Sequence, residues 1–202
     1  QEAHCLAVSL SQVEAGFSKH KEAPHWLPPL FESIRAMVSY CAKMGDRETQ
    51  EGYFNLLGQV GNQQMRQDWE VGVAHVCCYT GVDFFRLGLM ELANEHLLKS
   101  IDYTVKILDR NPLNTFWRER LGEAWKNLAV LEYTNHNLER EKKCYEIAAD
   151  QYLRLLRLTG ETRFGQILSN LLTNIFHICK ELKDEEGMAY YWNIHQALFL
   201  RN

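Results

Sequence analysis

Proline occupies only four positions of the 202-residue chain, and this distribution limits the fold more than any other feature of the sequence. The positions are Pro24, Pro28, Pro29 and Pro112, so residues 30–111 and 113–202 contain no proline. Proline breaks a helix interior because it lacks the backbone N–H and its ring clashes with the preceding turn. Both proline-free stretches are rich in Leu, Ala, Glu, Lys, Gln and Arg, which favour helices. The sequence therefore predicts long helices and few strands.

Apolar residues recur at three- and four-residue steps along both stretches. Ile167, Leu171, Ile175, Ile178 and Leu182 form one such series, and this spacing places them on one face of a helix. Turn and cap residues interrupt the series near residues 43–46, 86–88, 111–112, 134–137, 159–162 and 183–184. These signals predict nine helices, at residues 3–19, 29–43, 47–65, 67–87, 90–110, 114–134, 138–158, 162–182 and 185–201.

Short connections determine how the predicted helices pair. Because so few residues join them, each helix must pack antiparallel against the next one in sequence. We expect a single all-α domain over residues 1–202, with hairpins at about 29–65, 67–110, 114–158 and 162–201. Helix 3–19 would cap this row or belong to a hairpin whose other half is missing. The chain begins at Gln1 without a leader sequence, which suggests a fragment of a longer protein or a processed chain.

The hairpins carry an order of small and large residues that resembles the tetratricopeptide repeat (TPR) family, in a long-repeat variant. The second hairpin matches at Cys77, Gly81, Phe84, Gly88, Ala93, Leu97 and Ser100, with small residues where two helices touch and a glycine in the turn. The third matches at Trp125, Leu128, Ala129, Tyr145 and Ala148, but has Glu141 for a small residue and His136 for the turn glycine. The first matches at Ile34, Val38, Cys41, Gly45, Phe54 and Leu57, with Gln50 at a small position, and the fourth matches in residues 168–175.

This resemblance implies a right-handed α-α superhelix of about four antiparallel hairpins plus an N-terminal helix. It also implies a protein-interaction scaffold or adaptor, because the first helices of such hairpins line a concave groove that binds other proteins. A generic α-helical bundle is the alternative, since any tightly packed helical hairpins need small residues where they cross.

Charge and cysteine content exclude several classes of function. The chain has 22 Lys and Arg against 26 Asp and Glu, a net charge of −4, which is untypical of nucleic-acid-binding proteins. No apolar run is long enough for a transmembrane helix. Six cysteines lie at spacings that fit no disulfide framework, which favours a reducing, cytoplasmic setting.

Motifs of catalysis, metal binding or cofactor binding are missing from the sequence. The Gly58–Gly61 segment lacks the lysine and the preceding strand of a phosphate-binding loop. His75, Cys77 and Cys78 are the most metal-like group, but a structural zinc site needs four ligands, and buried cysteines are usually apolar fillers. We therefore expect a non-catalytic protein without a metal site or a cofactor.

Candidate binding residues follow from the groove that the TPR resemblance implies. The residues expected to face it are Arg35, Lys43, His75, Phe85, Arg86, Lys126, Asn127, Tyr133, Phe176 and Lys180. Cations and large apolar groups dominate this set, and the nearest acids are Glu32 and Glu123 at its margin. The sequence thus predicts a locally basic groove that binds an acidic protein or peptide segment.

Two other classes of function stay open at the sequence level. One is a structural spacer or obligate subunit of a larger complex, whose partner subunit covers the end helices. The other is an all-helical enzyme or small-ligand carrier with a pocket near His75, His177 and Tyr191.

Overall fold

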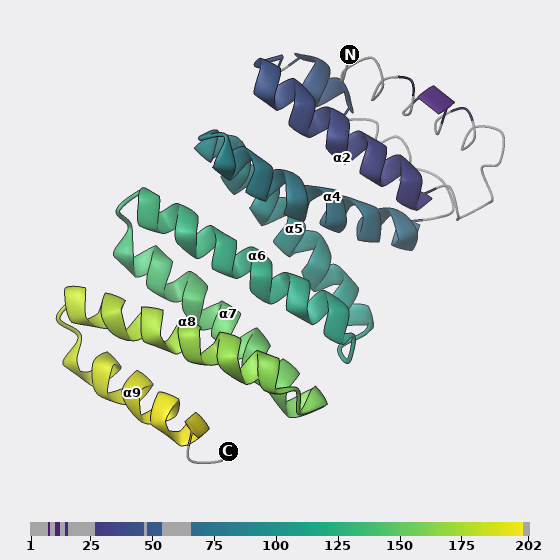
Figure 1. The fold of residues 1–202 in the computed structure, drawn as a ribbon. Helices are drawn as coiled ribbons and strands as arrows, with labels where there is room; N and C mark the ends of the chain where they lie inside the picture. The colour runs from purple at the N-terminus through teal and green to yellow at the C-terminus, as the bar shows by residue number, and fades with distance from the viewer. Residues whose placement is uncertain are drawn as a thin grey trace. The chain divides into compact units, whose positions relative to one another are not determined.

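The computed structural model describes residues 8, 11, 12, 15, 27–46, 48–53 and 66–199. Within these residues every regular element is a helix, so the all-α prediction is confirmed (Figure 1). The helices are α2 (Leu27–Met44), α4 (Arg66–Arg86), α5 (Met90–Arg110), α6 (Thr115–Thr134), α7 (Leu138–Thr159), α8 (Thr162–Glu181) and α9 (Glu185–Phe199). Residues 48–53 are helical, as are residues 8, 11, 12 and 15, whereas the rest of predicted helices 3–19 and 47–65 lies outside the described residues.

Local sequence signals account for the observed helix ends. Asn114 and Asn137 cap α6 and α7, where their side chains accept hydrogen bonds from the backbone N–H of Trp117 and Arg140. Gly160 ends α7 in the left-handed conformation, at φ 68°. The two prolines at the start of α2 lie in its first turn, where the missing N–H costs no helical hydrogen bond.

The chain divides into two compact units, Gln1–Ile107 and Leu108–Asn202. In the second unit α6 and α7 form one antiparallel hairpin and α8 and α9 form another, and α7 packs against α8 (Figure 1). Tyr152, Leu155, Phe164 and Ile175 are at most 1% exposed and form the centre of its core. Burial of such apolar side chains holds the two hairpins together.

In the first unit close helix contacts depend on glycine. Phe31 of α2 packs directly over Gly72 of α4, and a Cβ at position 72 would lie 1.9 Å from the Phe31 ring. Leu97 of α5 packs over Gly81 of α4, where a Cβ would lie 2.9 Å from its Cγ atom. Ser100 of α5 donates a hydrogen bond to the carbonyl oxygen of Ala74 at 3.0 Å. The small residues of the TPR-like pattern thus lie where α4 and α5 touch.

One turn geometry recurs at all four hairpin connections. Gly45, Gly88, His136 and Lys183 each adopt a positive φ, between 55° and 76°. In each case this residue donates its N–H three residues back, and the next residue donates its N–H five residues back. This pair of hydrogen bonds is the Schellman motif, which ends a helix through a left-handed residue. In the fourth hairpin, which matches the TPR-like pattern only in residues 168–175, Lys183 is the left-handed residue of this turn.

His136→Gly is expected to stabilise the second unit by about 0.5 kcal/mol. A side chain in the left-handed region is strained, whereas glycine adopts it without a steric penalty, and the exposed His136 ring loses little packing. Gly160→Ala is the opposite control in the same unit and should cost about 1 kcal/mol, because it introduces that strain. Thermal unfolding of both variants measures the two changes, and the expectation is wrong if His136→Gly lowers the unfolding temperature.

Candidate functional site

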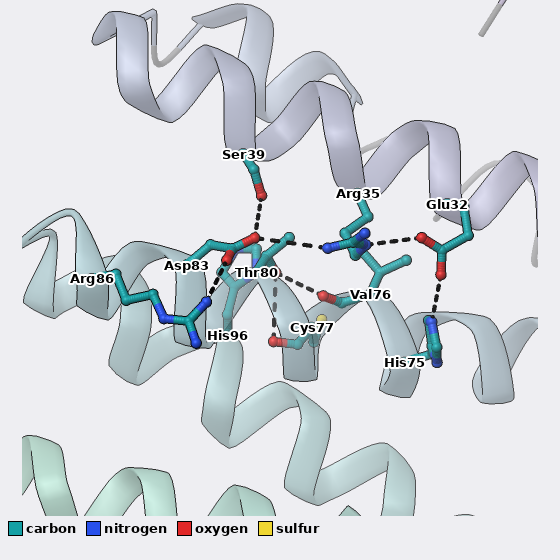
Figure 2. Close-up of polar contacts among 10 residues, drawn as sticks. All are labelled: Glu32, Arg35, Ser39, His75, Val76, Cys77, Thr80, Asp83, Arg86 and His96. Carbon is teal, nitrogen blue, oxygen red and sulfur yellow. Dashed lines mark hydrogen bonds and ion pairs between the residues drawn. The ribbon is translucent and has the colours of Figure 1, made fainter. Parts of the chain in front are cut away.

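A network of polar side chains connects α2 and α4 on the first unit (Figure 2). Asp83 of α4 lies at its centre, and Ser39 of α2 donates a hydrogen bond to Asp83 Oδ2 at 2.8 Å. Arg35 Nη1 lies 3.9 Å from the same oxygen, and Arg86 Nη1 lies 3.7 Å from Asp83 Oδ1. Asp83 therefore joins two predicted binding residues, Arg35 and Arg86.

A second carboxylate, Glu32 of α2, continues the network. Arg35 Nε donates to Glu32 Oε2 at 3.0 Å, and His75 Nε2 of α4 lies 2.8 Å from Glu32 Oε1. Burial raises the pKa of Glu32, but the hydrogen bonds to His75 and Arg35 outweigh it and hold the pKa below its usual value. Glu32 thus carries a negative charge between the two helices.

These contacts correct the expectation of a basic surface for the first unit. Arg35 and Arg86 each lie beside a carboxylate, which offsets their charge, and His75 Nε2 lies 2.8 Å from Glu32. The sequence reasoning missed Asp83, although Asp83 lies three residues before Arg86, a helical spacing at which opposite charges meet. The other two predicted residues of this unit do not join the network: Lys43 is exposed near the end of α2, and Phe85 is half-buried.

The remaining predicted residues lie on the first helices of the two hairpins of the second unit. Lys126 and Asn127 of α6 are half-buried, and Lys180 of α8 is exposed. Tyr133 of α6 is 61% exposed, unusual for a large aromatic side chain. Phe176 of α8 is half-buried, and its ring centroid lies 5.8 Å from that of Trp192, so it takes part in the packing of α8 against α9.

A pocket of about 250 Å³ opens between α6, α7 and α8 of the second unit. It is lined by Tyr133, Leu138, Glu141, Tyr145, Asn174, His177, Ile178 and Glu181. Of the predicted binding residues only Tyr133 contributes to it, while His177 comes from the alternative enzyme or carrier hypothesis. Two carboxylates, Glu141 and Glu181, are among the lining residues, so the side chains around this pocket are acidic in composition.

Glu141 is the unusual residue of this pocket. It is only 5% exposed, and its Oε2 atom is buried without a hydrogen-bond partner among the described residues. Burial raises its pKa, and the nearby charge of Glu181 raises it further. The basic neighbours of Glu141 in sequence are engaged elsewhere, because Arg140 pairs with Glu132 at 3.1 Å and Lys142 with Asp184 at 2.6 Å.

Glu141 was visible in the sequence only as a departure from the TPR-like pattern. The same position of the second hairpin holds Ala93, which is fully buried, and that of the first holds Gln50, which is 4% exposed. A large acidic residue at a position that packs between helices is costly unless its charge is satisfied. That cost is the signal that marks the position as a candidate site.

The residues that the sequence offered as metal ligands make other contacts or are buried. His75 Nε2 lies 2.8 Å from Glu32 Oε1, and Cys77 is fully buried, where desolvation raises its pKa to about 12. Across the described ranges no three His, Cys, Asp or Glu side chains come together as metal ligands would. None of the helices described is long and apolar enough to span a bilayer.

Comparisons with known proteins give structural neighbours of low sequence identity. No protein-family model matches the chain, and no curated protein matches it. The crystal structure of BtubC (BKLC) from P. vanneervenii is 14% identical with a TM-score of 0.49, and the alignment covers 99% of this chain and 90% of that chain. The structure of MamA from MSR-1 is 16% identical with a TM-score of 0.39, covering 96% of this chain and 94% of that chain.

Proposed function

We propose that this protein is a non-catalytic interaction module whose second unit binds a segment of a partner protein. The observation that carries the proposal is the open pocket of about 250 Å³ between α6, α7 and α8, with Tyr133 61% exposed and contributing to its lining. Exposed tyrosines beside a depression are typical anchors of protein interfaces, because they bury a large area at a low cost in conformational entropy. The resemblance of the hairpins to TPR repeats supports the same function.

The chemistry of the pocket supports binding over catalysis. Its side chains include one exposed imidazole, two phenols, an amide and two carboxylates, and no serine or cysteine nucleophile. Lys126 and Lys180 make no ion pair with the residues that the structure describes, so they are free to meet carboxylates of the partner segment. The proposal therefore keeps a partner segment with acidic residues, which would contact these two lysines. It does not extend this contact to the first unit, where the predicted cations lie beside carboxylates.

The test compares two tyrosines of equal exposure. A photo-crosslinking phenylalanine analogue is placed at position 133 on α6 or at position 190 on α9, where Tyr190 is also 61% exposed. In an extract of the cells that produce the protein, position 133 should yield a discrete protein adduct and position 190 should not. Once mass spectrometry identifies the partner, Tyr133→Ala should weaken binding by about 30-fold, or about 2 kcal/mol, since the anchor loses its buried area.

Tyr190→Ala is the matched control and should leave the dissociation constant unchanged. The proposal fails if position 133 gives no adduct, or if Tyr190→Ala weakens binding as much as Tyr133→Ala does. Circular dichroism of both variants verifies that the helices are intact.

A second candidate function, an obligate subunit of a larger complex, is favoured by the surface of α9. Tyr190 and Trp192 are 61% and 51% exposed on this helix. Residues 187–198 include no Asp, Glu, Lys or Arg, although much of this helix faces solvent. In this case the adduct would form at position 190 instead of position 133, so the same experiment separates the two functions.

A further inference from the structure

The pocket of the second unit contains a buried carboxyl oxygen for which no described residue supplies a hydrogen bond. Glu141 is 5% exposed, its Oε2 atom has no hydrogen-bond partner within the described part of the chain, and Glu181 adds a second carboxylate to the same lining. A buried carboxylate without a partner is costly, and proteins usually pair such a group with a cation. Because Arg140 and Lys142 are committed to Glu132 and Asp184, the chain supplies no basic side chain to Glu141 from these neighbours.

The uncharged lining residues suit a flat cation. Tyr133 and Tyr145 contribute aromatic rings, and Leu138 and Ile178 contribute apolar surface on which methylene groups can pack. Asn174 adds an amide to the same wall. A guanidinium group stacks on aromatic rings and offers five N–H donors in a planar fork, which serve two carboxylates and an amide better than an ammonium group does.

We propose that this pocket receives an arginine side chain of the partner segment, with its guanidinium group bound to Glu141 and Glu181. The proposal rests on the proposed function, because it names the residue by which the bound segment is recognised. Arginine capture removes the cost of the buried carboxylate only in the complex, so it contributes to specificity for segments that carry this residue. Lysine would bind at the same place more weakly, as a single point charge.

The experiment uses the full 202-residue chain and two small probes of nearly the same shape, one positively charged and one neutral. These are N-acetyl-arginine methylamide and its uncharged isostere, N-acetyl-citrulline methylamide, titrated at pH 7 while amide chemical shifts are followed by NMR. We expect the arginine probe to shift signals of residues that line the pocket and to bind at least about tenfold more tightly than the citrulline probe. Equal binding of the two probes, or shifts confined to other parts of the chain, would overturn the proposal.

Two glutamine variants on the same helix separate the pocket from overall charge. Glu141→Gln should remove the advantage of arginine over citrulline, whereas Glu139→Gln, at an exposed position of the first turn of α7, should keep it. If both variants lose the advantage equally, the effect is one of net charge and the proposal is wrong. If Glu141→Gln fails to fold, Glu181→Gln takes its place, and an undiminished preference for arginine in that variant counts against the site.

Failure of the arginine proposal can be distinguished from failure of the proposed function. If a partner crosslinks at position 133 but the arginine probe does not bind, the proposed interaction module still holds and only the arginine site is wrong. If the partner is captured, replacing each arginine of its bound segment by citrulline should identify one position whose loss matches that of Glu141→Gln.

Discussion

Acidification from pH 6.5 to pH 4 is expected to lower the free energy of unfolding of the first unit by about 3 kcal/mol through His96 alone. His96 of α5 is 4% exposed and hydrogen-bonded to Thr80 of α4 at 2.7 Å (Figure 2). Thr80 Oγ1 also donates to the carbonyl oxygen of Val76 at 2.8 Å, so its hydroxyl can accept from His96 Nδ1–H. The neutral ring thus fits its site without a charge.

Whether acid raises or lowers the free energy of unfolding follows from the pKa of His96 in the folded and the unfolded chain. Burial is the main cause that lowers its pKa from 6.5 to about 4 in the folded protein. The unfolded chain therefore takes up a proton first as the pH falls, and this stabilises the unfolded state progressively between pH 6.5 and pH 4. Above about pH 7.5 the ring is neutral in both states and has no effect on the pH dependence.

The measurement compares the parent chain with His96→Gln, whose amide can still donate to Thr80. As the pH falls from 7 to 4, the free energy of unfolding should decrease by about 3 kcal/mol more in the parent than in the variant. Amide hydrogen exchange in α4 and α5 reports on this unit alone. Removing the exposed His136 in the second unit should not change the difference, and a parent-to-variant difference that is constant with pH would contradict the expectation.

Gly72→Ala is expected to destabilise the first unit by about 2 kcal/mol, the typical cost of forcing extra atoms into a packed core. The new Cβ would lie 1.9 Å from Phe31 Cζ and 2.0 Å from Cε2, so the ring must leave its position. Phe31 is 5% exposed and has little space to move into. This loss exceeds the gain of about 1 kcal/mol that alanine usually brings to a helix interior.

Gly52→Ala isolates that gain. Position 52 is also helical, but nothing lies within 4 Å of a Cβ added there. We expect this variant to be more stable by about 1 kcal/mol, since only helix propensity changes. Urea unfolding of both variants measures the two effects, and a Gly72→Ala chain as stable as Gly52→Ala would show that Phe31 moves at no cost.

Helix positions were predictable from the sequence because they depend on local signals. Proline placement, apolar periodicity and cap residues gave the bounds of α4 to α9 to within about two residues. The contacts of Gly81 with Leu97 and of Ser100 with Ala74 agree with the small-residue pattern of the second hairpin. The right-handed superhelix and the single domain stay predictions.

The candidate site was harder to predict because its charges depend on contacts between helices. Ser39 and Asp83 are 44 positions apart in the sequence, so no helical spacing rule could predict their hydrogen bond. Lys126 has an acid three residues before it, Glu123, but Glu123 pairs with Arg120 at 2.6 Å, and Lys126 makes no ion pair with the described residues. Only the spatial neighbours of a charged residue decide whether a face is basic, neutral or acidic.

The shared geometry of the four hairpin turns has a consequence for how the chain tolerates extra length. Their left-handed residues are 43, 48 and 47 positions apart, at 45, 88, 136 and 183, yet the hydrogen bonds of the turns are the same. Unequal spacing is thus absorbed elsewhere, as in the links at residues 111–114 and 160–161. Insertions that accommodate a label or a loop graft belong at residues 111–113, since an added residue in a Schellman turn, or at the caps Asn114 and Gly160, would break capping bonds.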